Sequence, residues 1–72
     1  MSAKEMFEKL GYEYLTDYKY CLFRYVNKNE NPFVYIYFYE DKTIELATDY
    51  ELSYKVYQAI NKQIEELGWN NE

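Results

Sequence analysis

The pattern of apolar positions is strongest in residues 33–39, which read Phe-Val-Tyr-Ile-Tyr-Phe-Tyr. Successive side chains of a β-strand point to opposite faces, so this run predicts a strand with two different faces. One face consists of Val34, Ile36 and Phe38. The other consists of Phe33, Tyr35, Tyr37 and Tyr39. A small protein has little material to cover both faces, so we expect the first face to form the core and the tyrosines to form a surface.

Apolar positions recur at helical spacing near both ends of the chain. Ser2 and Glu5 form a capping-box pattern, so we predict a short helix over residues 3–10 that ends at Gly11. A second helix is predicted over residues 54–67, with Ser53 as its N-cap and Gly68 as its stop. The residues predicted to form its apolar stripe are Val56, Tyr57, Ile60, Ile64 and Leu67.

Between the helices the chain is rich in residues that favour strands. Residues 18–26 predict a strand whose inner face carries Cys21, Phe23 and Tyr25 and whose outer face carries Arg24. Residues 12–15 either extend this strand or are irregular. A turn is predicted over residues 27–32, and a tight turn over residues 40–42. Residues 43–47 then predict a last strand, with its aliphatic side chains inward and Glu45 outward.

The element order predicts an α+β fold in one small domain that spans residues 1–72. Short connections between consecutive strands indicate a three-stranded antiparallel meander. The economical arrangement packs both helices on one face of the sheet, which leaves the tyrosines uncovered. The alternative places one helix on each face and would bury the tyrosines as well.

Composition narrows the classes of function. The net charge is -5, so the surface repels phosphate backbones and anionic lipids, and we expect neither nucleic-acid nor membrane binding. A single cysteine excludes an intrachain disulfide. Apolar runs are too short for a bilayer-spanning helix, and residues 1–5 lack a hydrophobic signal region. We therefore expect a protein of the reducing cytoplasm.

The two ends of the chain resemble a known group of proteins. Residues 3–13 (AKEMFEKLGYE) are similar to the opening, and residues 59–69 (AINKQIEELGW) to the closing segment, of many short proteins encoded by phages and prophages of Gram-positive bacteria. Together these segments cover about a third of the chain. The resemblance implies a small accessory protein working in the host cytoplasm. It implies no settled activity, so it assigns no functional residue.

Residue types needed for catalysis are scarce. The chain has no histidine, and Cys21 lies in an apolar segment, where a small buried side chain is the simplest interpretation. Carboxylates are frequent between residues 40 and 51, but their spacing does not match a calcium-binding loop, and a solvated acidic rim explains them. Both glycines lie at helix ends, so no phosphate-binding loop is present. We expect no enzyme activity, no cofactor and no metal.

The tyrosines of the central strand suggest a binding surface or plain sheet packing. Exposed aromatic area usually marks an interaction site, and tyrosine and arginine are enriched at protein interfaces. The predicted protein-binding face comprises Tyr35, Tyr37, Tyr39, Arg24 and Glu45. Its partner would be a host protein or a second copy of the chain in a homodimer. The alternative function is acidic mimicry of nucleic acid, in which carboxylates occupy a basic site on a host protein.

Overall fold

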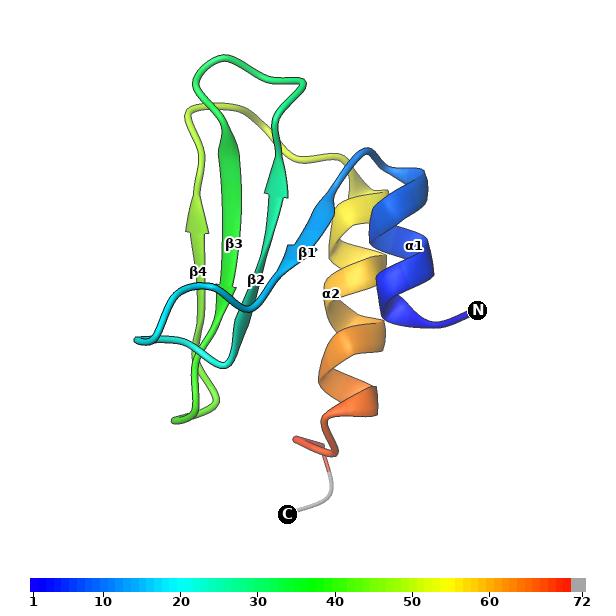
Figure 1. The fold of residues 1–72 in the computed structure, drawn as a ribbon. Helices are drawn as coiled ribbons and strands as arrows, with labels where there is room; N and C mark the ends of the chain where they lie inside the picture. Colours follow the sequence, from blue (N-terminus) through cyan, green and yellow to red (C-terminus); the bar gives the residue numbers. More distant parts are fainter. Residues whose placement is uncertain (71–72) are drawn as a thin grey trace.

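The computed structural model describes residues 1–70 and confirms the α+β class. Its elements, in chain order, are α1 (Ala3–Lys9), β1 (Glu13–Leu15), β2 (Phe23–Asn27), β3 (Val34–Phe38), β4 (Ile44–Ala47) and α2 (Tyr54–Glu66) (Figure 1). The strands form one antiparallel sheet in the order β1-β2-β3-β4. The connections are those of a meander, because each strand pairs with the next one in the chain.

Within the described residues the sheet has four strands, so the prediction of three strands was wrong. The additional strand is β1, which falls in the segment whose structure the sequence left open. It has only three residues, and Tyr14 at its centre pairs with Tyr25 of β2. Three residues are too few for an alternating pattern, so this strand is specified by its partner rather than by its own sequence.

The strand predicted over residues 18–26 begins later than expected, at Phe23 of β2. The chain must reverse direction between β1 and β2 because these strands are antiparallel. Residues 16–22 make that reversal as a loop, in which the backbone N–H of Cys21 donates to the carbonyl of Tyr18 at 3.3 Å. Cys21 therefore lies in the loop and not on the inner face of a strand. The inward placement of Phe23 and Tyr25 is confirmed.

Both helices lie on the same face of the sheet (Figure 1). Tyr25 shows this directly, because its ring stacks on Phe7 of α1 at a centroid distance of 3.9 Å. Its hydroxyl donates a hydrogen bond of 2.6 Å to Oε1 of Gln63 in α2. The alternative with one helix on each face is therefore wrong. Burial also raises the pKa of Tyr25, since an ionised phenol would lose its hydration there.

Both helices end as predicted, at Gly11 and Gly68, and they end in the same way. Each glycine has a positive φ, 92° and 73° respectively. The residue after each glycine donates its backbone N–H back into the helix: Tyr12 to Phe7 and Trp69 to Ile64. These are the bonds of a Schellman motif, in which a left-handed residue lets the last carbonyls find partners. Trp69 thereby reaches the core, where its ring lies 6.2 Å from that of Phe38.

The predicted apolar stripe of α2 needs one correction. Tyr57 is 46% exposed, so it does not belong to the inner face of the helix. Ala59 and Gln63 lie there instead, together with Val56 and Ile60. A large aromatic ring at position 57 can lie on the outer side because its hydroxyl stays in water. Gln63 is buried because it accepts the hydrogen bond from the core tyrosine of β2.

The two N-caps differ, and this difference predicts a difference in stability. Ser2 and Glu5 form the predicted capping box, whereas Ser53 occupies the N-cap position without a side-chain hydrogen bond. We expect Ser2→Ala to lower the free energy of unfolding by about 1 kcal/mol. Ser53→Ala is the matched control and should change it by much less. Urea denaturation followed by tryptophan fluorescence measures both variants, and equal losses would contradict this assignment.

Candidate functional site

The candidate site is the sheet face that points away from the helices. The strand register arranges its side chains in rows, with Arg24 opposite Tyr37 and Tyr37 opposite Glu45. This row runs from a cation through an aromatic ring to a carboxylate at the outer strand. Tyr35 and Tyr39 lie on either side of it along β3. All five predicted residues are therefore brought together, and we call this surface the tyrosine face.

The tyrosines of this face stack along β3 and its extension. The rings of Tyr35 and Tyr37 are 5.8 Å apart with an interplanar angle of 22°, and those of Tyr37 and Tyr39 are 6.1 Å apart at 16°. Phe33 continues the ladder at one end, 6.4 Å from Tyr35, and is 44% exposed. The three tyrosines are half-buried because neighbouring rings cover part of each side chain. The result is a flat, ordered aromatic surface with polar hydroxyl tips.

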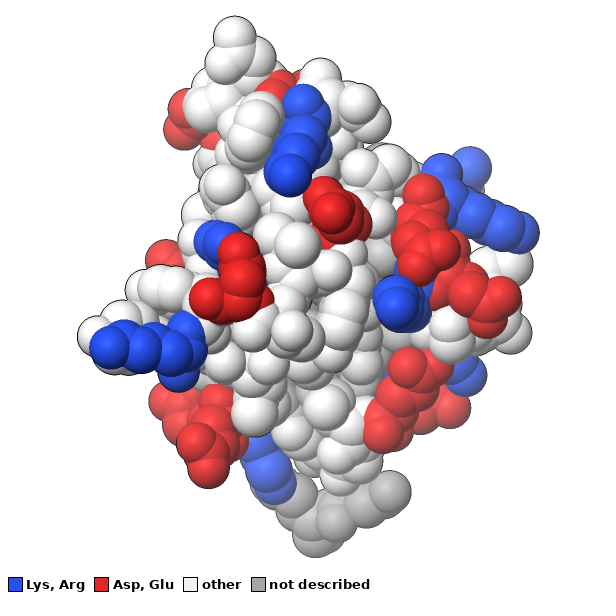
Figure 2. All heavy atoms as spheres, viewed as in Figure 1, with Lys and Arg blue, Asp and Glu red and all other residues white. Residues whose placement is uncertain are grey.

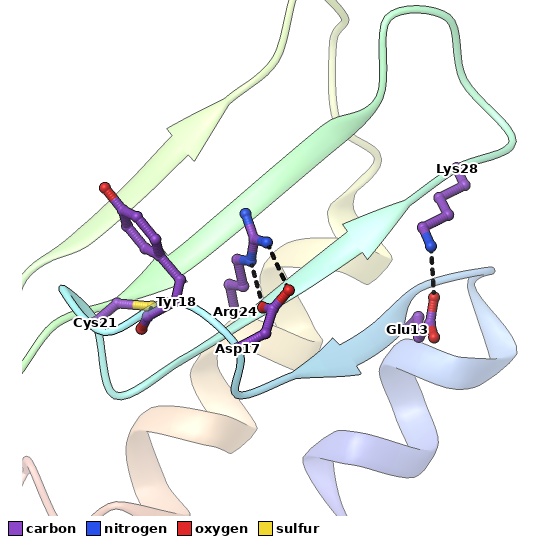
Figure 3. A network of polar contacts seen from close by, with 6 residues as sticks. All are labelled: Glu13, Asp17, Tyr18, Cys21, Arg24 and Lys28. Carbon is purple, nitrogen blue, oxygen red and sulfur yellow. Dashed lines mark hydrogen bonds and ion pairs between the residues drawn. The ribbon is translucent and has the colours of Figure 1, made fainter.

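Arg24 stands at the centre of the tyrosine face. Its guanidinium carbon lies 5.0 Å from the ring centre of Tyr35, 5.8 Å from that of Tyr37 and 5.5 Å from that of Tyr18. Nε and Nη2 also donate to the two carboxylate oxygens of Asp17, each at 3.1 Å (Figure 3). Such bidentate pairing orients the planar group as well as attracting it.

The Asp17–Arg24 pair changes the ionisation of both partners. Hydrogen bonds from the guanidinium lower the pKa of Asp17, and the carboxylate in turn raises the pKa of Arg24. Both groups therefore stay charged at neutral pH. A similar pair lies at the other end of β2, where Lys28 Nζ is 3.3 Å from Glu13 (Figure 3). That pair is mostly exposed, whereas the Arg24 side chain is only 18% exposed.

The sequence did not identify the contribution of the loop over residues 16–22. Asp17 anchors Arg24, and Tyr18 lies 5.8 Å from Tyr37 in an edge-to-face contact. Tyr20 contacts Tyr18 and is 66% exposed, so it extends the aromatic surface beyond the sheet. The strand predicted over residues 18–26 includes Tyr18 and Tyr20, whereas Asp17 precedes it. The sequence does contain one indication of this contact, because the acidic residue Asp17 lies seven positions before Arg24, the only arginine of the chain.

Tyr39 and Glu45 form a polar contact at the outer margin of the tyrosine face. The tyrosine hydroxyl donates to Oε1 of Glu45 at 2.5 Å. This hydrogen bond to a carboxylate raises the pKa of Tyr39 to about 12. Tyr12 and Tyr25 also have raised pKa values, but burial is the main cause in those two cases. Tyr39 is therefore the tyrosine of this face whose ionisation reports on a specific partner.

We expect Glu45→Ala to return the pKa of Tyr39 toward its ordinary value of 10.0. Because the folded-state pKa lies above the unfolded-state pKa, this contact stabilises the fold fully below pH 10 and loses its effect as the pH rises toward 12. NMR titration of ring-labelled tyrosine follows each phenol separately. A pKa for Tyr39 that does not change in the variant would show that the carboxylate does not hold this hydroxyl.

A metal site, a reactive cysteine and a membrane-spanning helix find less support in the structure than the tyrosine face does. Among residues 1–70, no group of three or more histidine, cysteine, aspartate or glutamate side chains is arranged to hold a metal ion. Burial raises the pKa of Cys21, which disfavours the reactive thiolate. In the same part of the chain, no helix has the length and apolar character needed to cross a membrane. On the side of the molecule shown in Figure 2, basic side chains lie among the acidic ones around an uncharged centre.

Comparisons with known proteins return no relative. No family model, no curated protein and no solved structure matches the chain.

Proposed function

We propose that this chain is a non-catalytic accessory protein of a phage or prophage that binds another protein through the tyrosine face. One observation carries the binding role: the helices cover only one face of the sheet, while the other holds a stacked tyrosine ladder around an anchored arginine. Tyrosine and arginine are the residues that contribute most often to binding hot spots. Rigid side chains also lose little conformational entropy on binding.

The phage origin is supported by the resemblance of the two ends of the chain. In the structure, the first of these segments covers α1, its capping glycine and the first residue of β1. The second covers the C-terminal part of α2 and the capping glycine of that helix. Both segments therefore also have structural roles. Between these two segments lie the strands that build the tyrosine face.

The acidic-mimic alternative requires carboxylates in an extended row, as phosphates are along a nucleic acid. On the side seen in Figure 2, basic side chains interrupt the acidic ones. The net charge of -5 is also modest for this role. Mimicry predicts binding to basic DNA-binding proteins that weakens steeply as salt rises. Salt-insensitive binding would count against it and favour contact through the aromatic surface.

Affinity capture from a lysate of a Gram-positive host tests the binding role. The variant Tyr35→Ser/Tyr37→Ser removes two rings of the tyrosine face. Its control, Tyr54→Ser/Tyr57→Ser, makes the same chemical change at two exposed positions of α2. We expect the first variant to lose a protein that the wild type and the control both retain. If all three capture identical proteins, the tyrosine face is not the binding surface.

A further inference from the structure

The outer edge of β4 pairs with no other strand of the described residues. This edge borders the tyrosine face. β4 pairs with β3 on one side only and forms the margin of the sheet (Figure 1). The opposite margin, β1, is shorter and packs against α1. Natural sheets usually protect an open edge with a short strand, a charged side chain, proline, a bulge or a covering segment, and β4 has the first two of these, with Glu45 in a strand of four residues. The sequence of β4, Ile-Glu-Leu-Ala, has no proline, and its register with β3 has no bulge.

The strand register shows which backbone groups face outward along this edge. The N–H of Tyr39 donates to the carbonyl of Thr43 at 2.9 Å, so this pair is hydrogen-bonded across β3 and β4. Alternation along an antiparallel ladder then directs the backbone groups of Glu45 toward β3. Those of Ile44 and Leu46 point away from the sheet. An added strand would find an N–H and a carbonyl at each of these two residues.

The side chains at the edge indicate the chemistry of that strand. The row Arg24–Tyr37–Glu45 ends in a carboxylate at the outermost strand. Tyr39 donates to one oxygen of this carboxylate. On the other face of β4, Leu46 is 38% exposed beside the core. A strand that alternates cationic and aliphatic residues would match both faces.

The charges around β4 disfavour a second copy of the chain as the occupant of this edge. Residues 40–51 contain five carboxylates and a single basic residue, Lys42. Two-fold antiparallel pairing of β4 about Glu45 would set this residue opposite its own counterpart, and like charges directly opposite each other destabilise a sheet. A basic segment would meet the same carboxylates favourably.

We infer that the β4 edge binds an extended, basic segment of a partner protein, which adds to the sheet as a fifth strand. A cationic side chain of this segment lies opposite Glu45 and completes the row on the tyrosine face. Aliphatic side chains of the segment lie beside Ile44 and Leu46. Backbone hydrogen bonds supply much of the affinity in this mode of recognition, and alternate side chains supply the specificity. The inference rests on the proposed binding function and names the kind of partner.

A synthetic peptide, acetyl-Val-Arg-Val-Arg-Val-amide, is the probe for this inference. Titration into the ¹⁵N-labelled full chain should shift the amide signals of Ile44 and Leu46 and protect them from hydrogen exchange. The matched peptide with glutamate in place of arginine should not bind. No shift at millimolar arginine peptide, or equal binding of the two peptides, would overturn the inference.

Two variants test the geometry of the edge. Leu46→Pro removes an outward N–H while sparing the ladder to β3, and we expect the affinity for the arginine peptide to fall by about tenfold or more. Glu45→Gln should lower the affinity about threefold, whereas its control Glu8→Gln, with the same change of charge on α1, should have little effect. Tryptophan fluorescence verifies that each variant is folded. Equal effects of the two glutamine substitutions would overturn the role of Glu45.

The outcomes distinguish this inference from the proposed function. If the peptide shifts signals at Tyr35 and Tyr37 but not at β4, the tyrosine face binds without strand addition, and only the further inference fails. If the peptide adds to β4 while Tyr35→Ser/Tyr37→Ser captures the same proteins as the wild type, the edge is a binding site and the tyrosine face is not. In that second case the proposed function fails on its own test.

Discussion

Replacing Phe7 with alanine is expected to bring the protein close to unfolding. Phe7 is fully buried, stacks on Tyr25 and makes an edge contact with Tyr12 at 5.6 Å. Removal of a buried phenylalanine side chain costs about 3–5 kcal/mol. A domain of this length has a free energy of unfolding of about 4–11 kcal/mol. The expected loss is therefore a large part of the total free energy of unfolding. It is large because the Phe7 ring packs α1 against Tyr25 of the sheet.

Phe33→Ala provides the matched control, since it makes the same chemical change at a position that is 44% exposed. We expect it to lower the free energy of unfolding by less than about 1 kcal/mol. Urea denaturation is measured by the fluorescence of Trp69, which packs against Phe38 and so reports on the core. If the two alanine variants were equally stable, the placement of α1 against Tyr25 would be wrong.

Replacing Arg24 with methionine is expected to weaken partner binding about tenfold or more, a loss of the size that buried arginine hot spots show. Methionine keeps an unbranched apolar stem but loses the bidentate contact with Asp17 and the charge over the tyrosine rings. The loop over residues 16–22 then loses its anchor, and Tyr18 no longer has a fixed place beside Tyr37. Binding should suffer more than folding, because the core does not depend on this arginine.

Lys28→Met is the control for Arg24→Met, because it removes the same charge from an exposed pair outside the tyrosine face. We expect this control to bind its partner as the wild type does. Amide hydrogen exchange should show faster exchange in the loop over residues 16–22 for Arg24→Met only. If both variants lose binding equally, then net charge, and not the arranged arginine, governs recognition.

Acid should release the same loop without any substitution. Because the pKa of Asp17 is lowered in the fold from its ordinary value of 3.8, the contact stabilises the loop above that pH and is lost as the pH falls through the lowered pKa. Asp17→Asn should show the released loop already at neutral pH.

Helices, strands and turns that are specified by residues close together in the chain could be predicted from the sequence. The capping box at Ser2 and the glycines at positions 11 and 68 are local signals, and the helices begin and end within a residue of the predicted positions. The alternating run of β3 likewise predicted which side chains enter the core. The turn over residues 40–42 follows from Asp41, whose carboxylate accepts hydrogen bonds from the N–H and hydroxyl of Thr43.

Features that depend on pairing across the sheet could not be predicted in this way. β1 forms because β2 offers it an edge, and its three residues carry no pattern of their own. Once β1 exists, the aromatic residues before Phe23 must form a loop, although their composition favours a strand. The predicted binding face combined residues of β2, β3 and β4 but did not include Asp17 and Tyr18, which complete the setting of Arg24.

The central claim is that the tyrosine face contacts a partner protein, and site-specific photo-cross-linking tests it most directly. Benzoylphenylalanine is placed at position 37 on this face or at position 57 on the outer side of α2, and the chain is irradiated in a Gram-positive host cell. We predict a cross-linked protein from position 37 and none from position 57. Adducts from position 57 alone, or equal yields from both positions, would contradict the claim.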